Sequence, residues 1–109
     1  MAKVKITQKR NNSTEISFSG ELTIFCAMEV YQEHLQTIKL KPKVIIKLSS
    51  VSEIDTAGIQ ILLMLFKEIT KQNGEYEISS LNDVISDYIK LFRLEHYFSP
   101  SSKDIEPQL

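Results

Sequence analysis

The 109-residue sequence predicts a single α/β domain in which helices pack on a mixed β-sheet. A short apolar run rich in β-branched residues, Val44–Leu48, has the pattern of a strand that is covered on both faces. The stretch from Thr56 to about Thr70 is apolar at helical spacing. Two N-terminal segments alternate apolar and polar residues, as half-exposed strands do. The predicted order of elements is therefore β-β-α-β-α-β-α, with a possible final strand.

The N-terminal segments predict a β-hairpin. Val4 and Ile6 alternate with polar residues, and the polar cluster Lys9–Thr14 indicates a turn. Apolar residues alternate again over Glu15–Ser19, which predicts a second strand antiparallel to the first. We expect this second strand to end at Gly20.

An amphipathic helix is predicted over Glu21–Leu40, with Thr23 as its N-cap and Pro42 closing the connection to the next strand. The residues of its apolar side recur at spacings of three and four: Ala27, Val30, Tyr31, His34, Leu35 and Ile38. The strand that begins at Val44 is expected to stop at the serines, which are Ser49, Ser50 and Ser52.

The segment Ile54–Gly58 turns the chain into the next helix, and Asp55 and Thr56 are both suitable caps for it. The first backbone N–H groups of a helix have no internal partner, and Asp, Ser and Thr oxygens commonly accept from them. The Thr56 hydroxyl has a further property, because a phosphoryl group on it would lie at the positive end of the helix dipole. Two interpretations remain open: Thr56 is only a cap, or it is a modification site.

The helix after Thr56 carries more apolar surface than a helix on one side of a sheet needs. One face holds Ile59, Leu62, Leu63, Phe66 and Ile69, and elsewhere on the circumference lie Ile61, Met64 and Leu65. Either a neighbouring helix covers the additional residues, or they form a partner-docking surface beside Thr56.

The C-terminal part of the sequence predicts one further strand and one further helix. Asn73-Gly74 ends the preceding helix, and Tyr76–Ser80 has the pattern of a strand parallel to the previous one. Asn82 or Asp83 caps a last helix, whose inner stripe is expected to be Val84, Ile85, Tyr88, Ile89 and Phe92.

The end of the domain is predicted close to residue 98. Tyr97 and Phe98 are candidates for a short edge strand. The residues after them are polar and include two prolines. We therefore expect one domain over residues 1–98 and a flexible tail over residues 99–109.

The composition argues against several classes of protein. With 13 basic and 14 acidic residues the net charge is −1, so nothing directs the chain to nucleic acid or to an anionic membrane. Cys26 is the only cysteine, so no disulfide framework or thiolate metal site can form within one chain. Met1–Arg10 lacks the apolar segment of a signal peptide, and the longest apolar run, Ile61–Phe66, is too short to span a bilayer. These features predict a soluble cytoplasmic protein.

Signatures of catalysis or of cofactor binding are scarce. The three glycines lie too far apart for a phosphate-binding loop. His34 and His96 have no partners at metal-ligand spacing. Glu53 and Asp55 could flank a site, but residues two apart on a strand share a face without forming an acid/base pair. We expect no enzyme activity, no metal site and no cofactor.

Three spaced motifs form a pattern: Gly20-Glu21-Leu22, Leu48-Ser49, and Val51–Ile59 with the apolar helix behind it. In this pattern the chain resembles the STAS domains, the family of the anti-sigma factor antagonists. The family has Asp, then Ser or Thr, then a small residue, then Gly after the third strand, and Asp55-Thr56-Ala57-Gly58 matches this order. The resemblance extends from about Val4 to Phe98.

The resemblance implies a four- or five-stranded mixed sheet with helices packed mainly on one side. It also implies that a partner kinase, which doubles as the anti-sigma factor, phosphorylates the hydroxyl residue after Asp. The unmodified form binds that partner and frees the sigma factor, whereas the phosphorylated form lets go. By position, Thr56 is the phosphate acceptor. The implied partner-binding residues are Glu21, Thr23, Asp55, Thr56, Ala57, Gly58, Gln60, Ile61 and Met64.

Two departures from the family pattern keep a second function open. Thr23 stands where the family often has Asp, and Thr56 where the sigma-factor antagonists mostly have Ser. The same motif also resembles the small STAS subunit of bacterial lipid-transport ABC complexes, which binds the ATPase through this surface. It further resembles STAS proteins tied to chemotaxis, biofilm or two-component pathways. The expected partner is therefore a protein, either an anti-sigma factor with serine-threonine kinase activity or an ATPase subunit, and a homodimer is also compatible.

Overall fold

Over residues 2–98, which a computed structural model of the chain describes, four strands form one mixed sheet. They are β1 (Lys3–Lys9), β2 (Ser13–Leu22), β3 (Lys43–Ile54) and β4 (Glu75–Ser80), in the spatial order β1-β2-β3-β4. β1 and β2 pair antiparallel, while β3 is parallel to both β2 and β4. The predicted N-terminal hairpin and the predicted parallel pairing of the third and fourth strands are both confirmed.

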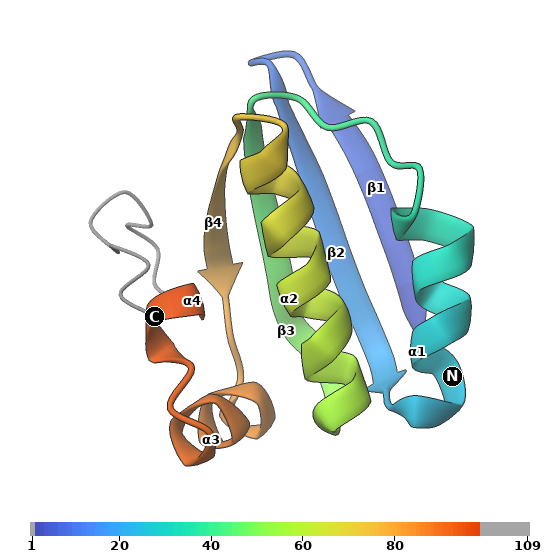
Figure 1. Cartoon of the computed structure of the whole chain (residues 1–109), viewed down its shortest axis with the longest axis vertical. Helices are drawn as coiled ribbons and strands as arrows, with labels where there is room; N and C mark the ends of the chain where they lie inside the picture. Colours follow the sequence, from blue (N-terminus) through green and yellow to red (C-terminus); the bar gives the residue numbers. More distant parts are fainter. Residues whose placement is uncertain (1, 99–109) are drawn as a thin grey trace.

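The helices in the described part of the chain are α1 (Ile24–Val30), α2 (Thr56–Lys71), α3 (Asp83–Leu91) and the short α4 (Glu95–Phe98). A π-helical turn, η1 (Tyr31–Leu35), continues α1. In Figure 1, α1 and α2 lie side by side in front of the strands, so they cover the same face of the sheet. The predicted α/β class and the four-stranded mixed sheet are confirmed.

The core lies between this face of the sheet and α2. Because side chains alternate along a strand, every second residue of β2 up to Phe18 and of β3 up to Leu48 points at the helices and is buried. Burying each such Ile, Leu or Phe side chain contributes about 1.5–3 kcal/mol, so this layer is the main source of stability. Its members include Ile16, Phe18, Val44, Ile46 and Leu48 from the sheet, and Ile59, Leu62, Phe66 and Ile69 from α2.

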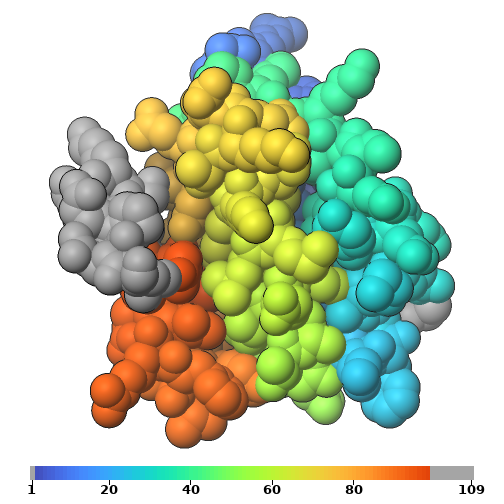
Figure 2. All heavy atoms as spheres, in the orientation of Figure 1, coloured from blue at the N-terminus to red at the C-terminus, as the bar shows by residue number. Residues whose placement is uncertain are grey.

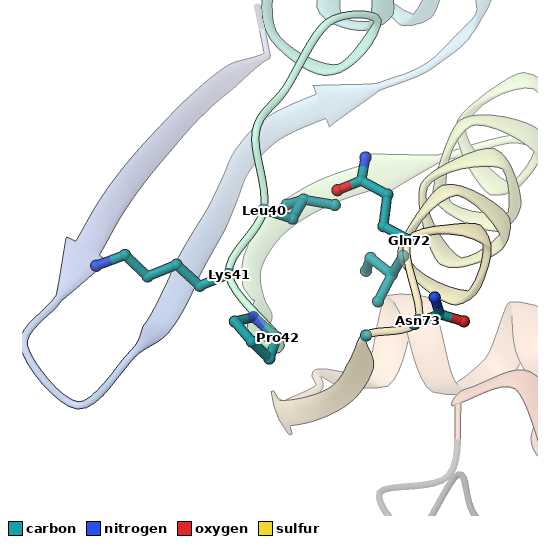
Figure 3. Close-up of a pocket in the computed structure, with 7 residues that line it drawn as sticks. Leu40, Lys41, Pro42, Gln72 and Asn73 are labelled. Atoms are coloured by element: carbon teal, nitrogen blue, oxygen red, sulfur yellow. The ribbon is translucent and has the colours of Figure 1, made fainter.

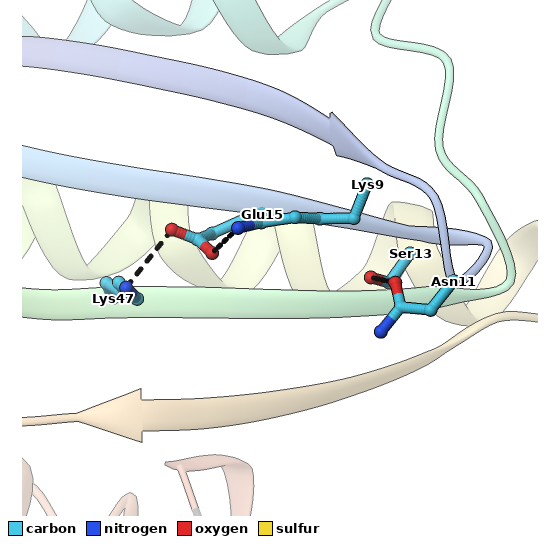
Figure 4. Close-up of polar contacts among 5 residues, drawn as sticks. All are labelled: Lys9, Asn11, Ser13, Glu15 and Lys47. Carbon is cyan, nitrogen blue, oxygen red and sulfur yellow. Dashed lines mark hydrogen bonds and ion pairs between the residues drawn. The ribbon is translucent and has the colours of Figure 1, made fainter.

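The opposite face of the sheet carries charged side chains (Figure 4). The Glu15 carboxylate on β2 lies 3.2 Å from Lys9 Nζ on β1 and 3.1 Å from Lys47 Nζ on β3. Hydrogen bonds from Lys47 and then Lys9 hold the pKa of Glu15 below its ordinary value of 4.5. A sheet that is packed on one face and solvated on the other shows this division between apolar and polar residues.

Both central strands run further than the sequence predicts. β2 continues past Gly20 to Leu22, and β3 continues through the three serines to Ile54. The pairing between the two strands shifts register twice, and each shift places an extra residue in β3. With these extra residues every third side chain faces the core, and the buried ones are Leu48, Val51 and Ile54. A search for apolar residues at every second position does not detect a strand with this spacing. The predicted C-terminal ends of β2 and β3 were therefore wrong.

The helix predicted over Glu21–Leu40 is shorter in the structure. α1 begins only at Ile24, because the residues before it still pair in the sheet. The π-helical turn after it is closed by a 2.8 Å hydrogen bond from Gln36 N to Tyr31 O. This wider turn changes the phase of the helix, so that Leu35 is buried while His34, predicted on the apolar side, is exposed.

The ends of α2 and α3 follow the predicted signals. Asn73 adopts a φ of 62°, and Gly74 N donates to Ile69 O at the end of α2. Asn82 is the cap of α3, since its side chain accepts from Ile85 N at 3.0 Å. The predicted inner stripe of α3 is only partly right. Its buried members are Ile85 and Ile89, whereas Val84 and Phe92 are 41% and 50% exposed.

The predicted edge strand at Tyr97 and Phe98 is wrong, because these residues belong to α4. The Phe98 ring meets Phe66 edge-on at 5.1 Å, and Phe66 stacks on Tyr76 at 4.4 Å. Tyr76 Oη also donates to Tyr97 O at 2.7 Å. These aromatic contacts bury Phe98 against α2 rather than along the edge of the sheet. The predicted tail, residues 99–109, lies outside the described residues.

Candidate functional site

The candidate site lies at the end of the sheet where two parallel strands finish and two helices begin (Figure 1). Leu22 at the end of β2 pairs with Ile54 at the end of β3. One residue later the chain caps a helix in each case, with Thr23 before α1 and Asp55 before α2. The parallel pairing therefore places two helix N-termini next to each other.

The Asp55 carboxylate caps both helices. Its Oδ1 accepts from Gly58 N in α2 at 3.0 Å, and its Oδ2 accepts from Ile24 N in α1 at 2.9 Å. Thr23 occupies the predicted N-cap position of α1, but its side chain makes no capping hydrogen bond. A carboxylate has two acceptor oxygens, which explains how one residue can satisfy backbone donors from two helices.

Gly58 lies where the first turn of α2 crosses the end of β2. A Cβ atom at this position would be 2.0 Å from Leu22 O and 2.8 Å from Ile54 Cγ1. Both distances are far below a van der Waals contact, and the nearer atom belongs to the backbone. The glycine of the motif is therefore required by space, because α2 could not approach β2 this closely with any larger residue.

Thr56 is the first residue of α2, and it is exposed. Its hydroxyl does not cap the helix, since Asp55 does so. Instead, Thr56 Oγ1 lies 2.8 Å from Tyr88 Oη on α3, and either atom can be the donor. The Tyr88 ring packs against Phe92 with 4.8 Å between ring centroids. The interpretation that Thr56 serves only as a helix cap is wrong, so its hydroxyl needs another explanation.

The structure brings most of the predicted partner-binding residues to this end of the molecule. Four are exposed (Glu21, Thr56, Gln60 and Met64), two are half-buried (Asp55 and Ala57), and three are buried (Thr23, Gly58 and Ile61). The buried three support the surface rather than form it. The additional apolar residues of α2 are largely covered, because α1 packs beside α2 and only Met64 stays partly exposed, at 38%.

Three apolar residues beside the site were missed by the sequence reasoning. Ile24, Phe25 and Met28 on α1 are 67%, 91% and 63% exposed. The sequence held one indication of their exposure. The apolar stripe predicted for this helix begins with Ala27 and Val30, and these three residues were not part of it. In Figure 2 the N-terminal end of α2 lies between α1 and α3. The hydrogen bond from Ile24 N to Asp55 Oδ2 ties the start of α1 to the residue before Thr56. We call Ile24, Phe25 and Met28 the α1 flank.

The features that would indicate an enzyme are not gathered at this site. Both Asp55 oxygens accept from backbone N–H groups, so this carboxylate has a structural role, and Glu53 and His34 are exposed. Among the residues that the structure describes, no group of three or more His, Cys, Asp or Glu side chains could hold a metal ion. No helix of the described chain is long and apolar enough to cross a membrane.

A small cavity of about 280 Å³ lies at the other end of α2 (Figure 3). Leu40, Lys41 and Pro42 line it from the connection before β3, and the end of α2 lines its other side with Ile69, Gln72, Asn73 and Gly74. None of these residues belongs to the Asp55–Gly58 turn, and Lys41 is the one charged residue among them. This cavity is therefore separate from the candidate site.

The match to known proteins agrees with this geometry. A family model described as the STAS domain matches residues 4–108 of the chain. The chain belongs to the STAS domain family. The Asp55-Thr56-Ala57-Gly58 turn that carried the resemblance is thus the turn at which this STAS domain places its two helix N-termini together.

Several solved structures share the fold of this STAS domain. An anti-sigma factor antagonist from Mycobacterium paratuberculosis is 18% identical with a TM-score of 0.68, covering 96% of this chain and 91% of that one. A putative anti-sigma factor antagonist from Thermotoga maritima is 18% identical with a TM-score of 0.67, at coverages of 94% and 93%. The Bacillus cell fate determinant SpoIIAA in its phosphorylated form is 13% identical with a TM-score of 0.65, at coverages of 94% and 96%. At these identities the likeness establishes the fold.

Proposed function

We propose that this STAS domain is a non-enzymatic, regulatory binding module of the anti-sigma factor antagonist type, whose affinity for a protein partner is set by phosphorylation of Thr56. One observation carries the proposal. The Thr56 hydroxyl is exposed at the start of α2 without being the cap of that helix. A capping oxygen is committed to a backbone N–H group, whereas this hydroxyl pairs with the side-chain hydroxyl of Tyr88 and belongs to an exposed residue that a kinase can reach.

The position of Thr56 tolerates a phosphoryl group. The N–H groups and the dipole of α2 favour negative charge at its N-terminus. Asp55 already accepts from Gly58 N and Ile24 N, so a phosphate on the neighbouring residue does not need to replace the cap. The module can therefore be modified while its fold is retained.

The α1 flank supplies the apolar area that a protein partner needs. Aromatic side chains in the centre of an interface often dominate its affinity, and Phe25 is 91% exposed. We propose that the partner is an anti-sigma factor with serine-threonine kinase activity, acting in the cytoplasm. Two similar structures support this choice: one is named as an anti-sigma factor antagonist, and the other is the Bacillus cell fate determinant SpoIIAA in its phosphorylated form.

Phosphorylation of Thr56 is expected to release the partner. Phosphothreonine carries a charge of about −1.5 to −2 at neutral pH. Desolvation and like-charge contact at an interface cost about 2–5 kcal/mol, and every 1.4 kcal/mol is a tenfold change in affinity. A phosphate beside the α1 flank should therefore weaken binding by roughly 30-fold or more.

The experiment has two parts. The chain is incubated with its partner kinase and ATP, and the phosphate is mapped by mass spectrometry, with Thr56 as the expected site. Calorimetry then compares partner binding by the wild type, Thr56→Ala and Thr56→Glu. We expect Thr56→Ala to bind like the wild type and to resist phosphorylation, and Thr56→Glu to bind at least about tenfold more weakly.

Thr70→Glu is the matched control, because Thr70 is an exposed threonine at the other end of the same helix. It should leave partner binding unchanged. Phosphate on another residue, or equal binding by Thr56→Ala and Thr56→Glu, would contradict the proposal. A stoichiometric complex with an ATPase that ignores the state of Thr56 would instead favour a structural subunit of the lipid-transport type.

A further inference from the structure

Tyr88 is the residue that contacts the Thr56 hydroxyl from another helix. The two oxygens are 2.8 Å apart, although the residues are 32 positions apart in the sequence. Tyr88 is half-buried, and its ring lies against Phe92 with an interplanar angle of 30°. The phenol is therefore held beside the start of α2 by its own helix.

α3 is itself firmly placed. Ile85 and Ile89 are buried in the core. The side chain of Asn82, which caps α3, donates to Ser49 O at 3.0 Å and to Val51 O at 2.7 Å in β3. These contacts hold α3 against the core and anchor its N-terminus to β3. Tyr88 should therefore keep its position when the side chain of Thr56 is modified.

The chemistry of modification changes that opposite group. A protein kinase transfers the γ-phosphoryl group of a nucleoside triphosphate. The Thr56 Oγ1–P bond forms, the P–O bond to the nucleoside diphosphate breaks, and the hydroxyl proton is released. Thr56 can then no longer donate to Tyr88. The new phosphoryl oxygens carry negative charge, and hydrogen bonds to such oxygens are roughly twice as strong as those between neutral groups.

We propose that Tyr88 is the phosphate-binding residue of the modified site: its phenol, which pairs with the Thr56 hydroxyl in the unmodified protein, donates a hydrogen bond to phosphothreonine 56. This inference rests on the proposed function, in which Thr56 is the residue that is modified. The geometric basis is that a phenol 2.8 Å from Oγ1 is within reach of the oxygens bonded through phosphorus to that atom. Tyr88 thereby makes α3 sensitive to the state of Thr56.

The inference can be tested without a kinase. The full chain is produced with phosphothreonine incorporated at position 56, and ³¹P NMR follows the second ionisation of the phosphate with pH. A hydrogen-bond donor stabilises the dianion, so the phosphate pKa should be lower in the wild type than in Tyr88→Phe, by about 0.3 or more. Asp55, Asp87 and the N–H groups of α2 are present in both proteins, so the difference isolates the phenol.

Two controls accompany this measurement. Tyr88→Phe keeps the ring that packs on Phe92, so its unmodified form should melt close to the wild type. Tyr31→Phe removes a phenol from a half-buried tyrosine in η1 and should leave the phosphate pKa as in the wild type. Equal phosphate pKa values in the wild type and Tyr88→Phe would overturn the proposal.

A second measurement needs no substitution. In the phosphorylated wild type with ¹³C-labelled tyrosine, the Cζ resonance of Tyr88 should follow the phosphate titration, while that of Tyr31 should not. A Tyr88 resonance that ignores the titration would also overturn the inference. Failure of every kinase to modify Thr56 would contradict the proposed function and leave these results unaffected, so the two failures are distinguishable.

Discussion

At the scale of single residues, the Asp55-Thr56-Ala57-Gly58 motif divides its tasks. Asp55 satisfies backbone donors from two helices, and Gly58 permits the close approach of α2 to β2. Neither of these tasks involves the Thr56 hydroxyl. The first and last residues of the motif build the turn, whereas the threonine between them pairs with the hydroxyl of Tyr88 on α3.

The double cap gives a stability prediction. Asp55→Ala leaves Ile24 N and Gly58 N without their acceptor, and should lower the free energy of unfolding by about 1–3 kcal/mol. Asp55→Asn keeps one acceptor oxygen and should cost less. Urea denaturation measures both. Glu53→Ala, an exposed neighbour on β3, is the control and should change the free energy of unfolding by less than about 0.5 kcal/mol. An Asp55→Ala variant as stable as this control would show that the double cap contributes little.

At the scale of elements, α1 is a short helix with two different faces. Ala27 and Val30 are buried against the core, while the α1 flank is solvent-exposed. Its first N–H group donates to Asp55, so the backbone at the start of α1 is tied to the residue before Thr56. Rigid placement lowers the entropy cost of binding, which suits a docking element.

The α1 flank predicts the effect of a single substitution. Under the proposed function, Phe25→Ala should weaken partner binding at least about tenfold, because an aromatic ring that is 91% exposed can serve as an anchor for a partner. It should leave the melting temperature nearly unchanged, since the ring contributes little to the core. Calorimetry with the partner and a thermal melt measure the two effects. Leu91→Ala, at an exposed apolar residue of α3, is the matched control. A partner that loses affinity only for Leu91→Ala docks on α3 instead.

At the scale of the whole molecule, the sheet separates a helical face from a charged face. The Asp55–Gly58 turn lies at one end of the helical face, and the charged face carries the ion pairs of Glu15 (Figure 4). Since the pKa of Glu15 is lowered in the folded protein, its contribution to stability is present above the ordinary pKa of 4.5. This contribution is lost as the pH falls from there through the lowered value.

The ion pairs of Glu15 on the charged face therefore predict part of the loss of folding stability at low pH. The wild type should lose more stability between pH 7 and pH 3 than Glu15→Gln, in which this group cannot titrate. Lys47→Met should reduce the same loss, because the hydrogen bond from Lys47 is the largest cause of the lowered pKa. Denaturation curves at several pH values measure the difference. An identical acid dependence of the wild type and Glu15→Gln would show that these ion pairs are fully screened by solvent.

Much of the architecture was predictable because it depends on local patterns. The hairpin, the parallel strands, α2 and its end at Asn73-Gly74 all follow from periodicity and turn residues. The errors lie where partner strands or packing override such patterns. Register shifts extend β3 through its serines, a π-helical turn rotates His34 outward, and aromatic packing makes Phe98 part of a helix.

The sequence by itself determined the order of elements, the family and the position of the Asp55-Thr56-Ala57-Gly58 turn, because each depends on residues close together in the chain. The tertiary structure alone decided that Asp55 caps both helices, that the α1 flank is exposed, and that Tyr88 meets Thr56. These contacts join residues about thirty positions apart, and no local pattern encodes which side chains meet across that separation. The parallel pairing of β2 and β3 brings Ile24 and Asp55 together. The packing of α3 at the same end of the sheet places the phenol of Tyr88 beside Thr56.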